Sequence, residues 1–113
     1  MIEEYEFGRI IIQGKVYTSD VIVHKNGVEE GWWRKEGHKV CMDDIKRVID
    51  LNPEIVVFGT GAYGRVKVED NVIEYLKKKG IDVYALETKE AIKLFESLLK
   101  QGKNVVLAAH LTC

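Results

Sequence analysis

The sequence predicts an α/β protein, a three-layer single domain with a mixed central sheet that is parallel in its C-terminal part. Three observations predict this fold. The 113 residues are the usual size of one domain. From about residue 43 onward, apolar runs alternate with amphipathic helical patterns, as in parallel strands joined by crossover helices. The residues before that point carry hairpin signals, which add antiparallel strands.

The first 40 residues have the pattern of short strands and turns. Residues 8–13 and 16–17 are strand-like and flank a hairpin-like break. Residues 21–24 continue the β pattern up to Asn26-Gly27, a strong turn dipeptide. Residues 31–38 lack periodicity, so we expect them at a strand edge or in a loop.

The C-terminal β-α-β-α-β part follows a first helix. The strands are continuous apolar runs, which indicates that both faces of the sheet are covered. Thr88 is expected to cap the last helix. Helices are expected at residues 43–52, 69–80 and 88–102, and strands at 55–58, 81–86 and 105–109.

Composition excludes several classes of protein. Hydrophobic residues make up 46% and charged residues 31% of the chain, which excludes a disordered protein. A net charge of −1 argues against nucleic-acid binding. No apolar run approaches the roughly 20 residues that span a bilayer, and no signal peptide is recognisable, so no membrane contact and a cytoplasmic location are expected. Abundant Lys and Glu hint at a thermophilic source.

Residues 59–64, GTGAYG, match the G-x-G-x-x-G pattern of dinucleotide-binding loops. A helix that starts near Glu69 and the lack of a second mononucleotide-binding half disfavour a dinucleotide site. Val66 lacks the hydroxyl that a P-loop needs for magnesium. No cofactor is therefore expected. Two interpretations stay open, a tight turn with positive φ at Gly59 or Gly61, and an anion site built from backbone N–H groups.

Ligands of open α/β sheets bind beyond the carboxyl ends of the parallel strands. Catalysis there would need His110, Thr112 or Cys113, but the sequence provides no recognisable nucleophile–base pair. No catalytic residue is assigned, and an enzyme is not the favoured interpretation. The candidate site for a small anionic ligand consists of Gly59, Thr60, Gly61, Arg65, Thr88 and His110.

Two H-x-x-C pairs, His38/Cys41 and His110/Cys113, contain the ligand types of a tetrahedral zinc site. On a strand, however, residues i and i+3 point to opposite faces, and neither pair contains a Gly or Pro for a tight turn. No metal site is predicted, and the two cysteines are expected to be free thiols.

Trp32-Trp33-Arg34 is the most unusual local cluster. Adjacent residues on a strand point to opposite faces, so one tryptophan can enter the core while the other stays near the surface. An exposed Trp beside an Arg is typical of protein-interface hot spots. The alternative is that both tryptophans pack under loops of the domain itself. These three residues form the candidate protein-binding patch.

A series of motifs resembles a known family over nearly the whole chain. They are Tyr5-x-Phe7-Gly8-x-Ile10, Tyr17-x-x-Asp20-Val21, Gly31-Trp32-Trp33-Arg34, Gly37-His38, Gly59-Thr60-Gly61, Tyr75-Leu76-Lys77-Lys78-x-Gly80-Ile81-Asp82-Val83, Thr88-x-x-Ala91 and His110-x-Thr112-Cys113. The chain resembles the small family named after a methanogen hypothetical protein, which includes the adipogenesis-associated domain protein and a mitochondrial respiratory complex I assembly factor. The resemblance implies a three-layer fold with a mixed sheet and no established enzymatic activity. Gly64 and Cys41 depart from the family pattern, which further disfavours dinucleotide and zinc binding.

The sequence thus favours a non-catalytic binding or assembly-type domain that acts through contacts with a protein partner at residues 32–34. The alternative is a small anionic-ligand binder or enzyme that uses the 59–64 loop and the segment 110–113. A third hypothesis is a self-associating domain whose apolar surface forms a homodimer.

Overall fold

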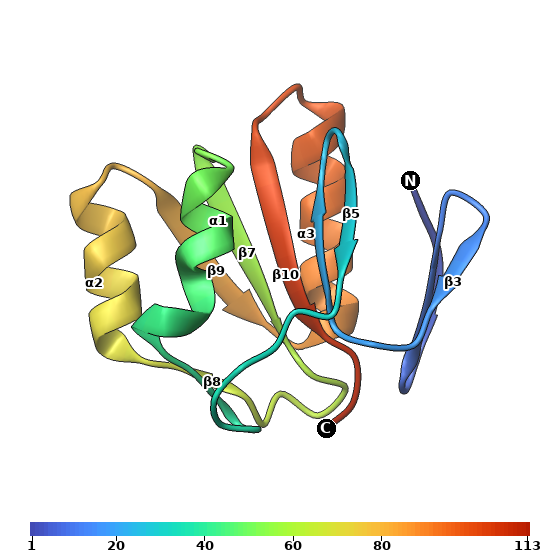
Figure 1. Ribbon diagram of the computed structural model, residues 1–113. Helices are drawn as coiled ribbons and strands as arrows, with labels where there is room; N and C mark the ends of the chain where they lie inside the picture. The colour runs from blue at the N-terminus through green and yellow to red at the C-terminus, as the bar shows by residue number, and fades with distance from the viewer.

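A five-stranded mixed sheet forms the centre of the computed structural model, which describes residues 1–113 (Figure 1). The strand order is β5-β4-β10-β7-β9. Strands β10, β7 and β9 are parallel, whereas β4 is antiparallel to β10 and β5 to β4. The strands are β4 (Val21–His24), β5 (Gly27–Glu30), β7 (Ile55–Thr60), β9 (Asp82–Leu86) and β10 (Val105–His110). The predicted mixed sheet, with its parallel C-terminal part, is confirmed.

Helices cover the sheet on both faces, which gives the three layers (Figure 1). The 3-10 turn η1 (Met42–Ile45), α1 (Lys46–Asp50) and α2 (Asp70–Lys78) pack on one face. The longest helix, α3 (Thr88–Lys100), packs on the other. Each face of the sheet has its own hydrophobic core. Because side chains alternate along a strand, Phe58 packs in the core on the side of α1 and α2, and its neighbour Val57 packs in the core on the side of α3. Strands β7 and β10 are buried at every position, as their apolar sequences predict.

The N-terminal hairpins divide between two sheets. Strands β4 and β5 join the central sheet, while β1 (Ile2–Glu6), β2 (Arg9–Ile12) and β3 (Lys15–Tyr17) form an antiparallel sheet of their own. This small sheet inserts Ile10 and Ile12 into the α3-side core. Strand β1 has no counterpart among the strands that the sequence patterns predict. The same is true of the short parallel pair β6 (Lys39–Val40) and β8 (Lys67–Val68).

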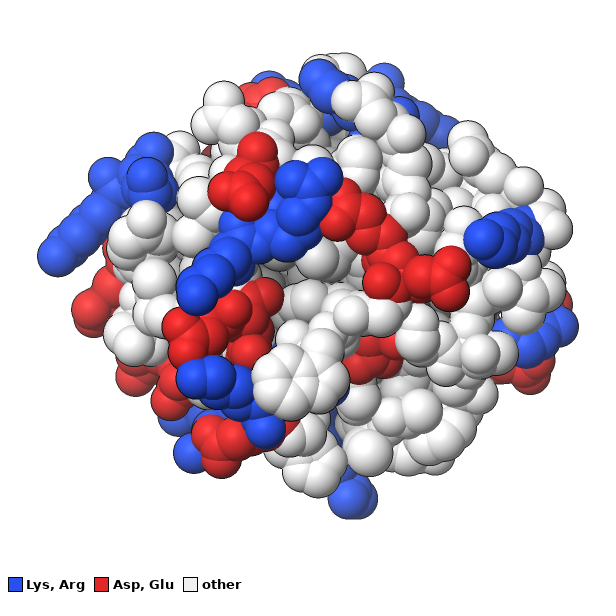
Figure 2. All heavy atoms as spheres, viewed as in Figure 1, with Lys and Arg blue, Asp and Glu red and all other residues white.

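Charges of both signs are mixed over the face of the molecule seen in Figure 2, with no large region of a single sign. The helices are too short and too polar to traverse a lipid bilayer.

Candidate functional site

The carboxyl ends of the parallel strands bring together four of the six predicted ligand-site residues. Thr60 and His110 end β7 and β10, Gly61 follows β7, and Thr88 opens α3 beside them. These four residues are all buried. Gly59 lies within β7, and its missing side chain lets Thr88 and β10 approach, because a Cβ there would lie 2.9 Å from the Thr88 hydroxyl. Only the Arg65 side chain is directed away, with its guanidinium 5.9 Å from the Tyr63 ring.

Thr88 joins the glycine loop to β10. Its hydroxyl accepts a hydrogen bond from the Gly61 N–H at 2.9 Å and donates one to the His110 carbonyl at 2.6 Å. The prediction that Thr88 caps α3 is therefore wrong, because Glu87 occupies the N-cap position and the Thr88 hydroxyl bonds to the loop after β7 and to β10. Local sequence could not reveal this, since both partners of the hydroxyl come from distant segments.

The glycine loop accommodates the backbone of residues 112–113. Gly61 has a φ of +103°, as one of the two interpretations of the loop predicts, and a Cβ on it would lie 2.3 Å from the Cys113 carbonyl carbon. The Ala62 N–H donates to the Thr112 carbonyl at 2.6 Å, and the Arg65 N–H donates to the Cys113 carbonyl at 3.3 Å. Amides that could hold an anion are thus bonded to carbonyl groups of this chain. An anionic ligand would have to displace residues 112–113, and ligand binding at this loop stays a prediction.

Sequence reasoning missed the central residue of this region, Asp20, which precedes β4. Its Oδ2 lies 2.6 Å from His110 Nδ1 and 2.7 Å from a guanidinium nitrogen of Arg34, and its Oδ1 accepts the Leu111 N–H at 2.8 Å. The sequence offers only an acidic residue directly before an apolar strand. Asp20 lies near the end of β10 because β4 and β10 are antiparallel neighbours, a pairing that the structure shows.

The charges of this cluster stabilise ionised Asp20. Burial by itself would raise the pKa of Asp20, but hydrogen bonds from His110, Arg34 and the Leu111 amide outweigh it and lower the pKa. His110 Nδ1 lies 2.6 Å from Asp20 Oδ2 and 2.8 Å from a guanidinium nitrogen of Arg34, and its Nε2 lies 3.1 Å from the Thr112 hydroxyl. Arg34 also donates to the Gly37 carbonyl, which ties the 31–37 loop to the same cluster.

Thr112, His110 and Asp20 stand in the order hydroxyl, imidazole, carboxylate, the order of a hydrolase triad. Two observations favour a structural role for this chain of contacts. Arg34 shares the Asp20 carboxylate, which weakens the support that the carboxylate can give to a charged imidazole. The cavities of the protein are lined by neither His110 nor Thr112. The cluster therefore anchors β4, β10 and the 31–37 loop to one another.

The predicted protein-binding patch separates into two residues with buried side chains and one exposed residue. Trp32 is buried, stacks on Phe58 with ring centroids 6.4 Å apart, and donates its indole N–H to the Asp44 carbonyl. The Arg34 side chain is 5% exposed and lies over the Trp32 ring. Trp33 is 73% exposed, so it alone presents the patch to solvent. The alternation of the two tryptophans is thus confirmed.

A groove of about 270 Å³ lies beside Trp33, between β5 and α1. Carboxylates are frequent in its lining, and Arg47, whose guanidinium lies 2.7 Å from Glu29, lowers the pKa of that carboxyl group. The groove is lined by Ile22, Glu29, Glu30, Gly31, Trp32, Trp33, Asp43, Asp44, Lys46 and Arg47.

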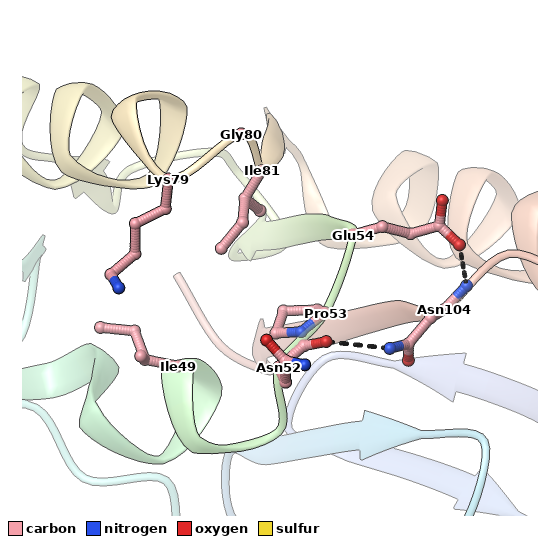
Figure 3. A pocket seen from close by; sticks show the side chains of 8 residues that line it. All are labelled: Ile49, Asn52, Pro53, Glu54, Lys79, Gly80, Ile81 and Asn104. Atoms are coloured by element: carbon pink, nitrogen blue, oxygen red, sulfur yellow. Dashed lines mark hydrogen bonds between the residues drawn. The ribbon is translucent and has the colours of Figure 1, made fainter.

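The largest cavity, about 600 Å³, lies at the opposite end of the parallel strands and contains no predicted site residue (Figure 3). The Lys79 side chain extends into it toward Ile49. Asn104 closes one side, since its amide groups donate to the Glu54 carboxylate and the Asn52 carbonyl. Cys41 and Cys113 are free thiols, and nowhere do three His, Cys, Asp or Glu side chains come close enough to hold a metal ion.

Comparison with known proteins places the whole chain in one group. A family model described as "Protein of unknown function (DUF498/DUF598)" matches residues 2–110. A conserved hypothetical protein of Pyrococcus horikoshii, PH1505, is 26% identical, with a TM-score of 0.87 over 100% of this chain and 99% of that chain. The protein MT938 is 24% identical, with a TM-score of 0.81 over 100% and 98%. XCC1710 of Xanthomonas campestris is 19% identical, with a TM-score of 0.85 over 98% and 83%.

Proposed function

The chain belongs to the DUF498/DUF598 family of proteins of unknown function, and we propose that it is a non-catalytic binding domain that acts through protein contacts. The observation that carries this proposal is the 73% exposure of Trp33. Tryptophan is highly buried on average, so a largely exposed indole is unusual, and tryptophan is enriched at the energetic centres of protein interfaces.

The loop that carries Trp33 is held on both sides. The Gly31 N–H donates to the Ser19 hydroxyl and the Trp32 N–H to the Asp20 carbonyl, while Arg34 is bound to Asp20. A partner would therefore meet an indole on a backbone that is already ordered. Binding to such a residue loses less conformational entropy than binding to a free loop.

The groove beside Trp33 favours a partner that presents a basic side chain. Its lining carries four carboxylates, from Glu29, Glu30, Asp43 and Asp44, against two cations, from Lys46 and Arg47, and the exposed Lys15 and Lys35 reach Glu30 and Asp43 from outside the groove. An Arg or Lys of a partner could lie against the indole face as a cation–π pair and close to the carboxylates. Electrostatic complementarity of this kind selects partners by charge.

The test is an NMR titration with a pair of short peptides that differ only in a central Arg or Glu. The Arg peptide should shift the Trp33 indole N–H resonance with millimolar affinity, and the Glu peptide should not. Trp33→Ala should abolish the shifts that the Arg peptide causes in the backbone N–H resonances of Glu29 and Gly31 in the groove lining, while the free energy of unfolding changes by no more than about 0.5 kcal/mol because the side chain is exposed. Tyr63→Ala, which removes another exposed aromatic ring, should leave binding intact. Equal shifts with both peptides, or none, would refute the proposal.

A further inference from the structure

Strand β9 is an outer strand of the central sheet and pairs only with β7. The Asp82 N–H donates to the Glu54 carbonyl, and the Leu86 carbonyl accepts the Thr60 hydroxyl. Successive residues of a strand direct their N–H and C=O groups to alternate sides. Residues 82, 84 and 86 thus face β7, and the backbone groups of Val83 and Ala85 point outward from the sheet.

The side chains of β9 leave apolar surface beside these free backbone groups. Tyr84 is 45% exposed and Leu86 is 36% exposed, and both lie on the same face of the strand. A groove of about 370 Å³, lined by residues that include Lys77, Ile81 and Tyr84, extends along the strand. Sheet edges are usually protected by a charge, a proline or a bulge. Here the register with β7 is regular, and Asp82 is the only charged residue within the strand.

We propose that β9 is the contact surface of a homodimer in which two copies pair antiparallel about a two-fold axis at Tyr84. In this register Val83 of one copy lies opposite Ala85 of the other. Each of these pairs exchanges its outward N–H and C=O groups, as in the hydrogen-bonded pairs of an antiparallel ladder. The two Tyr84 rings face each other across the axis, where aromatic cross-strand pairs are stabilising. The two central sheets become one continuous sheet.

Charge complementarity favours a second copy of this chain over an unrelated strand. In the same register Ile81 lies opposite Glu87 of the second copy. Lys77 lines the groove beside Ile81, so Glu87 of each copy approaches Lys77 of the other. Both side chains are exposed in the single chain. Asp82 lies opposite Leu86 of the second copy, so no like charges oppose each other between residues 81 and 87.

The contact leaves the proposed protein-binding surface free. Strand β5, next to the Trp33 groove, is the other outer strand of the sheet, with β4, β10 and β7 between it and β9. The homodimer is therefore independent of the function proposed above, and either can fail without the other.

Sedimentation equilibrium over a concentration series tests the homodimer. The mass should rise from 12.9 kDa to twice that value, with half-association below millimolar concentration. Lys77→Glu and Glu87→Lys should each raise the dissociation constant about tenfold, since each reversal affects two symmetric pairs. The double swap should restore most of the affinity. Lys100→Glu, at the far end of α3, is the matched control and should have no effect.

Ala85→Pro provides a second variant, because it removes an N–H that points away from β7. Circular dichroism should show a folded chain, and sedimentation should show a monomer at every concentration. If the wild type stays monomeric up to millimolar concentration, or if neither single charge reversal changes the dissociation constant, the proposal is wrong. If Ala85→Pro fails to fold, Lys77→Glu, Glu87→Lys and the double swap still test the homodimer.

Discussion

At the scale of single residues, Asp20 holds three segments together with one carboxylate. Asp20→Asn removes the charge opposite Arg34, whose side chain is 5% exposed and whose Nε already lacks a hydrogen-bond partner. Breaking a buried pair in this way leaves a cation uncompensated, so we expect a loss of about 3 kcal/mol in the free energy of unfolding, measured by urea denaturation. The matched control is Asp43→Asn, which removes an exposed partner of Lys35 and should change stability little.

The Asp20 carboxylate also makes the free energy of unfolding depend on pH in the acidic range. The pKa of Asp20 is lower in the folded protein than its ordinary value, so the unfolded chain takes up the proton first. Its contribution is fully present above about pH 4, near the unfolded pKa, and declines as pH falls through the folded pKa. Urea denaturation between pH 2 and 7 should therefore show the wild type and Asp20→Asn converging at low pH. A constant difference would contradict this role for Asp20.

Cys41 should be an unreactive thiol. Burial, and then a hydrogen bond to Glu69 together with the charge of that residue, raise its pKa to about 11. Because the thiolate is the nucleophile, iodoacetamide at pH 8 should modify Cys41 roughly a hundredfold more slowly than an ordinary cysteine. Mass spectrometry of the digested protein measures this rate for each cysteine. Glu69→Gln removes the neighbouring charge and should accelerate the reaction, and equal rates in both forms would rule out an effect of Glu69.

At the scale of elements, the loop after β7 depends on a glycine that leaves room for another segment. Gly61→Ala combines an unfavourable φ with a collision against the Cys113 carbonyl, so it should lower the free energy of unfolding by at least about 2 kcal/mol. Gly14→Ala is the matched control, since Gly14 also has a positive φ but has no atoms within 4 Å of the added Cβ. Gly14→Ala should lower the free energy of unfolding by about 1 kcal/mol, and thermal melting of both variants measures the difference. Equal losses would mean that the close approach contributes nothing.

The elements also show what the sequence could and could not predict. Local pattern predicts strands β7 and β10 from their continuous apolar runs and helix α2 from its helical periodicity of apolar residues. Strand β1 was missed because IEEYE buries no residue completely and lacks apolar alternation. The pair β6 and β8 has two residues in each strand, too few for any periodicity.

The candidate site was predictable only in part, for a related reason. Local pattern placed Thr60, Gly61, Thr88 and His110 at the carboxyl ends of the strands, where they lie. The Asp20 cluster depends on β4 lying antiparallel to β10, a pairing between residues about 90 positions apart. Burial of Arg34 depends on the same pairing. Residue types and their spacing along the chain do not indicate such long-range contacts.

At the scale of the whole molecule, the two outer strands of the central sheet have different surroundings. The edge at β5 lies beside the groove of Trp33, whereas the edge at β9 presents Tyr84 and Leu86. A homodimer through β9 would carry two Trp33 grooves on one rigid body. A partner with two basic sites at matching separation would then bind more tightly than one site allows, through effective concentration.

Strand β10 follows every other strand in sequence but lies in the middle of the sheet, between β4 and β7. During synthesis, β4 and β7 therefore leave the ribosome without the strand that separates them. At about 5 to 20 residues per second, the nascent chain carries Val57 and Phe58 for several seconds before residues 105–110 are available. The hydrophobic cores on both faces of the central sheet contain residues of β10. The domain therefore completes its fold in one late step, and until then its emerging apolar segments are open to chaperones.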